Sequence, residues 1–327
     1  MIRRRTFITL LGGTAAAWPI AARAQQAAMP VVGFVAGGSL DARRAAAFRK
    51  GLNEAGFVEG QNVTVEYHWL GGQYDLLPSL MADLVHRRVA VIATPAANYA
   101  AQAAKAATAT VPIIFGVGED PVRLGLVASL ARPGGNVTGI NFFMAELVAK
   151  RLGLLHQLVP KAIRIAALIN PANVPTAETT LRDLPASARA IGLQIQVLKA
   201  STTQEIEAVF ATMVRDQADA LFVAPDAFFG SERVQFARLA ARYAIPAAYS
   251  SRETVEVGGL MSYAADTLDG LRQVGLYTGQ VLKGAKPADL PVLQSTKFEF
   301  VINLQTARAL GIEVPSQLLA SADEVIE

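Results

Sequence analysis

The residues best placed to do chemistry in this chain are polar and aromatic residues that directly follow short apolar segments. Their hydroxyl, amide and carboxylate groups form hydrogen bonds, and their rings offer apolar or stacking surface. In open α/β sheets, ligands bind just outside the carboxyl ends of the strands, where such residues lie. The candidate ligand-binding residues are Gly38, Ser39, Thr94, Asn98, Asp120, Asn170, Asn173, Asp226, Phe228 and Ser250.

Several of these candidates also have a purely structural interpretation. Ser39 precedes a helical pattern that has Asp41 in its first turn, as an N-cap does. Asn170 and Asn173 flank Pro171, so they could serve only to stabilise a turn. Asp226 could merely support its own loop. Both interpretations stay open for each of these residues.

Catalytic motifs are missing from the sequence. Neither the dinucleotide-binding pattern G-x-G-x-x-G nor the phosphate loop G-x-x-x-x-G-K-[ST] occurs. The segment 37–41 departs from a G-x-S-x-G nucleophile elbow at its last position. The three histidines, His68, His86 and His156, do not have the spacing of metal ligands. We therefore expect no catalytic residues, no metal site and no cofactor.

The elements that position the candidates form a repeated alternation of strands and helices. Apolar segments at 31–36, 63–69, 89–93 and 111–115 predict strands, with helices at 40–56, 75–87 and 97–108. The pattern restarts with strands at 163–169, 193–198, 220–224 and 246–249 and helices at 174–190, 203–215 and 231–243. Such alternation predicts an α/β fold with two lobes, each a doubly wound parallel sheet.

We expect a multi-strand hinge to join the two lobes. Glycine-rich segments at 134–139 and 258–263 are candidate crossings, although ordinary turn chemistry also explains their glycines. A helix at 267–283 should return to the first lobe, and 298–303 with the tail should cross back. The predicted N-terminal lobe spans 29–138 plus about 264–290, and the C-terminal lobe spans 139–263 plus about 291–327.

The amino terminus predicts export. Arg3, Arg4 and Arg5 precede a weakly apolar segment, and small residues end at Ala24, as in a secretory signal sequence. Arg4 and Arg5 also match the twin-arginine pattern, while a Sec signal is the alternative. A membrane anchor is the less favoured interpretation, because the apolar segment is shorter than the ~20 residues that span a bilayer. We therefore expect a signal peptide at 1–24 and a periplasmic mature protein that does not span the membrane.

Charge and cysteine content argue against several classes of binding site. The chain has 30 Lys and Arg against 27 Asp and Glu, and four of those Arg lie in the acid-free segment 1–24. The mature chain is thus nearly neutral, so nucleic-acid binding has no electrostatic support. The sequence has no cysteine, which excludes disulfides, thiolate metal sites and a lipid-bearing cysteine.

The mature chain resembles the TrpX-like ABC transporter substrate-binding proteins, which have the type I periplasmic-binding-protein fold. The most specific shared run is Pro133-Gly134-Gly135-Asn136-Val137-Thr138-Gly139. The other shared segments are Gly33-Phe34-Val35, Gly38-Ser39, Gly51-Leu52, Gly56-Phe57, Gly60-Gln61-Asn62-Val63 and Asp120-Pro121-Val122. The resemblance implies a non-enzymatic receptor for a small organic ligand, with an ABC permease and ATPase complex as partners. Its better-known members take aromatic amino acids.

An amino-acid ligand would need a partner for each of its groups once water is excluded. On the sequence, Ser39 and Thr94 are candidates for its carboxylate, and Asp226 for its ammonium, with Asp120 in reserve. Phe228 and Phe229 are candidates for side-chain contact, although at least one should pack inside its lobe. A sensory receptor for a membrane signalling protein and an enzyme on the same fold stay open as alternatives.

Overall fold

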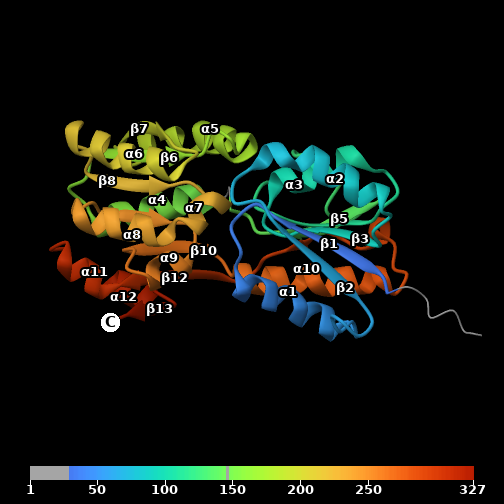
Figure 1. Cartoon of the computed structure of the whole chain (residues 1–327). Coiled ribbons are helices and arrows are strands. Elements are labelled where there is room, and N and C mark those ends of the chain that lie inside the picture. The colour runs from blue at the N-terminus through green and yellow to red at the C-terminus, as the bar shows by residue number, and fades with distance from the viewer. Residues whose placement is uncertain (1–28, 145–146) are drawn as a thin grey trace, which may run out of the picture.

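The chain folds into two α/β lobes in the computed structural model, which describes residues 29–144 and 147–327 (Figure 1). The predicted signal sequence lies outside these residues. The first lobe has a six-stranded sheet of order β11-β5-β4-β3-β1-β2. Its strands are β1 (Val31–Ala36), β2 (Thr64–Trp69), β3 (Val91–Thr94), β4 (Ile113–Val117), β5 (Val137–Asn141) and β11 (Leu293–Gln294).

The second lobe has a seven-stranded sheet of order β13-β12-β10-β9-β8-β6-β7. Only the β10–β12 pair is antiparallel among the described strand pairs of both sheets. The strands are β6 (Arg164–Ile169), β7 (Gln194–Lys199), β8 (Ala220–Val223), β9 (Ala247–Tyr249), β10 (Met261–Ala265), β12 (Phe298–Asn303) and β13 (Glu324–Ile326). Two predominantly parallel sheets confirm the predicted fold class.

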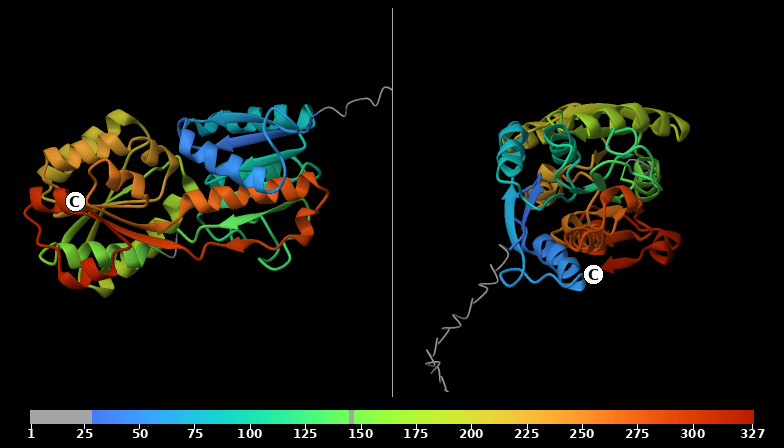
Figure 2. Two further views of the ribbon diagram at one scale, coloured as in Figure 1. Left: turned by 90° about the horizontal axis from the view of Figure 1, so that it is seen from below. Right: turned by 90° about the vertical axis from the view of Figure 1, so that its right-hand side faces the viewer.

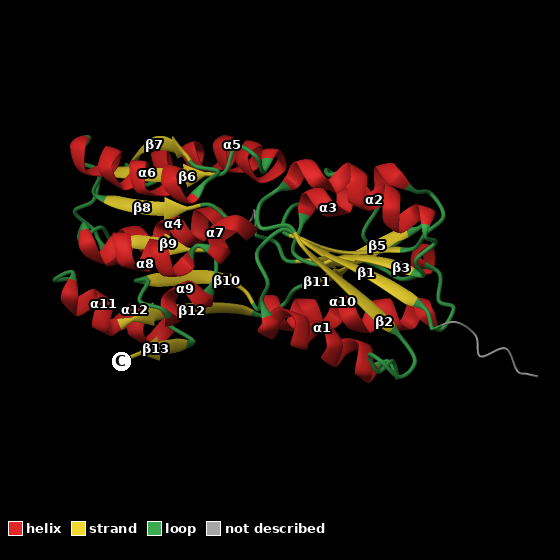
Figure 3. Cartoon of the chain, in the orientation of Figure 1, coloured by secondary structure: helices red, strands yellow, loops and turns green. Residues whose placement is uncertain are grey.

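Helices cover both faces of each sheet (Figure 3). The first lobe has α1 (Ala42–Glu54), α2 (Leu77–His86), α3 (Asn98–Ala107) and α10 (Thr267–Leu282). The second lobe has α4 (Leu147–Leu158), α5 (Val174–Ala190), α6 (Thr203–Arg215), α7 (Ala227–Ser231), α8 (Arg233–Arg242), α9 (Arg252–Glu256), α11 (Leu304–Ala309) and α12 (Ser316–Ser321). No helix among the described residues is long and apolar enough to cross a membrane.

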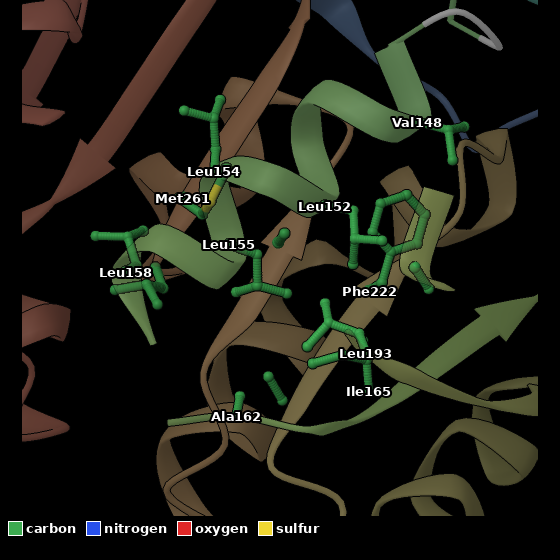
Figure 4. Packing of buried hydrophobic residues seen from close by; sticks show 14 of the residues in the cluster. Val148, Leu152, Leu154, Leu155, Leu158, Ala162, Ile165, Leu193, Phe222 and Met261 are labelled. Carbon is green, nitrogen blue, oxygen red and sulfur yellow. The ribbon is translucent and has the colours of Figure 1, made fainter. Parts of the chain in front are cut away.

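Alternate strand residues fill separate cores on the two faces of a sheet, which is why the strands are apolar throughout. In the first lobe, Val35 packs on the α2 and α3 side, whereas its neighbour Phe34 packs on the α1 and α10 side. In the second lobe, leucines of α4 lie against Phe222 and Ile165 of the sheet (Figure 4). Burial on both faces favours runs of Val, Ile and Leu over strict alternation.

The helix α10 belongs to the first lobe although it follows the second lobe in the chain. It lies alongside α1 (Figures 1 and 2). A Cβ atom on Gly275 would lie 2.1 Å from the Phe48 carbonyl oxygen, so glycine is what lets the two helices approach so closely. The predicted return of this helix to the first lobe is therefore confirmed.

The crossings between lobes lie a few residues later than expected. Residues 139–141 are still in the first sheet and 264–265 in the second, while β11 at 293–294 is back in the first. The glycine-rich segments 134–139 and 258–263 lead into β5 and β10 and include the first residues of these strands, so they are not the crossings. Gly134 and Gly135 have φ values of 72° and 67°, so they supply a left-handed turn, as the alternative interpretation held.

Candidate functional site

The carboxyl ends of the strands of both lobes face one another across a cleft. A cavity lies between them, with an empty volume of about 860 Å³ when its opening to solvent is included. Its walls combine apolar, aromatic, amide and charged side chains. Its lining residues include Arg44, Tyr74, Asn98, Tyr99, Glu119, Phe142, Met144, Asn173, Thr176, Asp226, Ser250 and Thr267.

Asp226 is the centre of the polar network in the second lobe. As the N-cap of α7, its Oδ1 accepts the backbone N–H groups of Phe228 (3.0 Å) and Phe229 (3.2 Å). Asn170 Nδ2 also donates to Oδ1 (3.1 Å), and Asn173 Nδ2 donates to Oδ2 (2.8 Å). Burial raises the pKa of Asp226, and these four donors oppose that shift by stabilising the carboxylate.

Asn173 has one atom that this network leaves unused. Its Oδ1 is buried and has no hydrogen-bond partner among the described residues, although Asn173 lines the cavity. An unsatisfied buried acceptor costs free energy, about 1–3 kcal/mol, unless a ligand or water supplies a donor. The cavity therefore has an acceptor available beside a carboxylate.

The first lobe gives the cavity an aromatic side. The rings of Tyr74 and Tyr99 lie 5.1 Å apart at an interplanar angle of 30°. Burial, followed by the nearby Asp226 carboxylate, raises the pKa of Tyr74, so its hydroxyl stays protonated and can donate. Phe142 and Met144, from the first crossing between lobes, complete the apolar surface.

The two lobes contact each other directly across the cleft. These contacts come from α1 and its preceding loop, from the β2–α2 and β4–β5 connections, and from α3. The hydrogen bonds are Ser39 N to Ser231 Oγ (2.8 Å), Arg43 Nη1 to Glu256 Oε2 (2.8 Å), Asn98 Nδ2 to Thr176 Oγ1 (3.1 Å), Arg123 Nη2 to Thr179 Oγ1 (3.2 Å), Tyr74 Oη to Asp226 Oδ2 (3.4 Å) and Val174 N to Tyr99 Oη. The structure thus shows the lobes closed on each other.

Four of the predicted ligand-binding residues line this cavity: Asn98, Asn173, Asp226 and Ser250. Two more, Gly38 and Ser39, line a second cavity beside it. A Cβ atom on Gly38 would lie 3.0 Å from the Ala227 carbonyl oxygen, so glycine allows this loop to reach the opposite lobe. The sequence thus located both sides of the cleft.

The other predicted residues lie elsewhere. Thr94 is fully buried within β3 and lines neither cavity. Asp120 accepts the Val122 N–H (2.8 Å) and lies in a separate outer groove. Asn170 lies behind Asp226 and outside the cavity lining, and Phe228 is buried in the core of its lobe together with Phe229. Position after a strand is therefore not sufficient to put a side chain in the cavity.

The N-cap of α1 is Asp41 and not Ser39. Asp41 Oδ1 accepts the backbone N–H groups of Arg43 (3.0 Å) and Arg44 (3.2 Å). A carboxylate at this position also interacts favourably with the helix dipole. The Ser39 backbone N–H instead donates to Ser231 of the opposite lobe.

Sequence reasoning missed Arg44, Tyr74, Tyr99 and Phe142. Tyr74 follows β2 through a turn at Gly71 and Gly72, which have φ values of 57° and 86°. Paired glycines after a strand were a usable signal for this loop. Arg44 is in the first turn of α1 and not in a loop after a strand, so its place in the sequence gives no signal of a cleft residue.

Comparisons with known proteins agree with this geometry. The family model described as "ABC transporter substrate binding protein" matches residues 28–326. A "Tyrosine-binding protein" from Clostridioides difficile is 28% identical over 269 residues, which is 81% of this chain and 76% of that protein.

Two solved structures of related proteins differ in how well they superpose. An ABC domain in complex with L-Trp from Streptococcus pneumonia has a TM-score of 0.80 at 28% identity, covering 91% of this chain and 100% of its own. A ligand-free, open substrate-binding protein from Clostridium difficile scores 0.63 at 25% identity, covering 91% and 99%. The structure of this chain thus superposes better on the tryptophan complex than on the ligand-free, open structure. On the family match over nearly all described residues, this chain belongs to the ABC transporter substrate-binding proteins.

Proposed function

We propose that this chain is the periplasmic receptor of an ABC importer, which closes over an aromatic amino acid and presents it to the permease and ATPase complex. The observation that carries the proposal is the cavity between the lobes, which has an aromatic side and a polar side. Relatives described as tyrosine-binding and as complexed with L-Trp support the same ligand class. The chain has no catalytic step in this proposal.

The aromatic side of the cavity suits the ligand's ring. Tyr74 and Tyr99 already form a tilted pair, and aromatic rings favour such offset or tilted contacts with ring centroids 4.5–7 Å apart. Phe142 and Met144 offer apolar surface, and a thioether also packs well against an aromatic ring. Burying the ligand's ring among these four side chains supplies the apolar part of the binding free energy.

The polar side suits the ligand's ammonium group. Asn173 Oδ1 is an available acceptor, and Asp226 supplies negative charge directly behind it. The Asp226 carboxylate already accepts four N–H groups, which is about its capacity. Asp226 is therefore assigned a positioning and electrostatic role, while Asn173 makes the contact.

A ligand screen tests the proposal. L-tyrosine, L-tryptophan and L-phenylalanine are compared with L-alanine, L-leucine and D-glucose for their effect on the unfolding temperature, followed by calorimetry. A ligand at 100 times its Kd should add about 2.7 kcal/mol to the unfolding free energy. Stabilisation by none of the three aromatic amino acids contradicts the proposed ligand class.

Export through the twin-arginine route is the localisation part of the proposal. It depends on Arg4 and Arg5, followed by the small residues before the expected cleavage site at Ala24. Replacing both arginines with lysine should leave the precursor unprocessed in the cytoplasm, as a blot of cell fractions would show. Normal processing of that variant would instead indicate a Sec signal.

A further inference from the structure

A second cavity adjoins the first and has no role in the proposed contacts with ring and ammonium group. Its empty volume is about 690 Å³, again including its opening to solvent. The first lobe contributes the loop from Gly37 to Asp41, the side chain of Arg44 and the end of β2. The second lobe contributes α7 and Arg233, the first residue of α8. Arg44 lines both cavities and so connects them.

Two guanidinium groups from opposite lobes converge on one glycine of this cavity. Arg233 Nη1 donates to the Gly230 carbonyl oxygen at 3.1 Å. Arg44 Nη2 reaches across the cleft, 3.9 Å from where a Cβ atom on Gly230 would be. Arg44 belongs to the first lobe and Arg233 to the second, so closure is what brings these two cations together.

Most donors of this pair have no protein partner. A guanidinium has five N–H groups. Among residues 29–144 and 147–327, the Arg44 side chain makes no hydrogen bond, and Arg233 makes only the one to Gly230. Asp41 has one oxygen occupied as the α1 N-cap, and its other oxygen lies 3.7 Å from Arg44 Nε. Asp41 therefore offsets the two positive charges only partly.

Closure without an anion brings like charges together, which opposes it. An anion bound between the two guanidinium groups makes closure favourable instead, because both lobes then attract the same negatively charged group. The planar fork of a guanidinium matches the two oxygens of a carboxylate, and such charge-assisted bonds are stronger than neutral ones. The ligand's carboxylate would thus couple binding to closure.

We propose that the second cavity is a carboxylate subsite, in which Arg44 and Arg233 hold the ligand's carboxylate between the lobes. This inference rests on the proposed function, because it gives the third group of the same amino acid its partners. In this proposal Arg44 and Arg233 take the carboxylate-binding role that the sequence suggested for Ser39 and Thr94. Specificity for amino acids over the corresponding amines would follow from this subsite.

Calorimetry with matched probes tests the subsite. The parent, Arg44→Gln and Arg233→Gln are titrated with L-tyrosine and with tyramine, which lacks the carboxylate, or with L-tryptophan and tryptamine if the parent prefers those. Each substitution should weaken binding of the amino acid at least about tenfold and leave that of the amine within about twofold. Parent-like affinity for the amino acid in either variant overturns the proposal.

Matched controls come from the same two helices. Arg49 of α1 and Arg238 of α8 line neither cavity, so Arg49→Gln and Arg238→Gln should bind the amino acid like the parent. A tenfold loss in these controls too would mean that overall charge, and not the subsite, sets the affinity, and would also overturn the proposal. Unfolding curves confirm that each variant is folded.

A second measurement separates this subsite from the proposed ligand class. If the parent binds no aromatic amino acid, the unfolding temperature is measured in sodium acetate, sodium phosphate and sodium chloride at equal ionic strength. A rise in acetate that is lost in Arg44→Gln and Arg233→Gln still supports a carboxylate subsite. An equal response in parent and variants, or a rise in phosphate alone, overturns it.

Discussion

The two walls of the cleft hold their polar groups in different ways. In the second lobe, Asp226 is bound by Asn170, Asn173 and two backbone amides of its own lobe. In the first lobe, the side-chain hydrogen bonds that Tyr74 and Arg43 make among the described residues both cross the cleft. The second wall is thus complete without closure, whereas the first wall is completed by it. Because the polar groups of the second wall are already held in place, the first wall supplies the hydrogen bonds that form on closure.

The largest expected effect comes from breaking the second wall. Asp226→Ala removes the acceptor of four N–H donors and leaves them facing a small cavity. Because unpaired buried donors cost about 1–3 kcal/mol each and water can reach some of them, we expect the unfolding free energy to fall by about 3 kcal/mol. Chemical denaturation without ligand measures this change.

Asp120→Ala is the matched control for that substitution. Asp120 also follows a strand and also accepts backbone N–H groups, but it does so in a turn in the outer groove. Its loss should cost less than about 1 kcal/mol. Equal losses for the two variants would show that the second wall is no more tightly organised than an ordinary turn.

Asp226→Asn sharpens the same comparison without breaking the wall. Asparagine caps helices as well as aspartate, and Asn173 can turn its amide so that Oδ1 accepts from the new side chain. Asn173 Oδ1 would then no longer be available to the ligand, and the negative charge of Asp226 would also be lost. We expect a near-parent unfolding free energy and about thirtyfold weaker binding of L-tyrosine or L-tryptophan, measured by calorimetry. Affinity within about threefold of the parent would remove Asp226 from the site.

Much of the fold could be predicted from the sequence because both faces of each sheet are buried. The strand at 31–36 and the helices at 174–190 and 203–215 were predicted with the bounds that the structure shows. The region after β8 was less well predicted. The single helix expected at 231–243 is two helices, because Asp226 caps the short helix α7 directly after the strand. Local capping is decided by side-chain geometry that periodicity does not report.

The candidate site was predictable on the second wall and only partly on the first. Asp226 lies three residues beyond β8 and Asn173 four residues beyond β6, in the polar turns that follow these strands. Tyr74 is five residues beyond β2, and Arg44 reaches the cleft from inside a helix. Both side chains are long enough to reach the cavity from outside the loops that follow the strands. The packing of α1 and of η1 (Tyr74–Leu76) directs them there, and the sequence pattern does not reveal that packing.

An intermediate effect is expected from removing one closure contact of the first wall. Tyr74→Phe keeps the ring beside Tyr99 and removes only the hydroxyl that donates to Asp226 at 3.4 Å. A single hydrogen bond of this kind contributes about 0.5–1.5 kcal/mol, so ligand affinity should fall about two- to tenfold. The unfolding free energy of the ligand-free protein should hardly change, because the contact forms on closure. Tyr243→Phe, outside both cavities, serves as the calorimetric control.

The smallest effect is expected at the ion pair of Arg43 with Glu256, which joins α1 to α9 across the lobes. The Arg43 side chain is 55% exposed, so the pair is screened by water and salt. Arg43→Gln should weaken ligand binding by no more than about fivefold at low salt, and the difference from the parent should vanish near 1 M NaCl. A difference that persists at high salt would mean that Arg43 acts by packing and not by charge.

The pH dependence of that pair has a defined sign. The hydrogen bond from Arg43 lowers the pKa of Glu256, so the pair favours closure above the ordinary glutamate pKa of about 4.3. Its contribution is lost as pH falls through the lowered pKa, when Glu256 takes up a proton. Parent and Arg43→Gln should therefore differ in ligand affinity at pH 7 and become more alike as pH falls below the ordinary glutamate pKa, as titration calorimetry at a series of pH values would show. A difference that persists once Glu256 is protonated would exclude this ion pair as a closure contact.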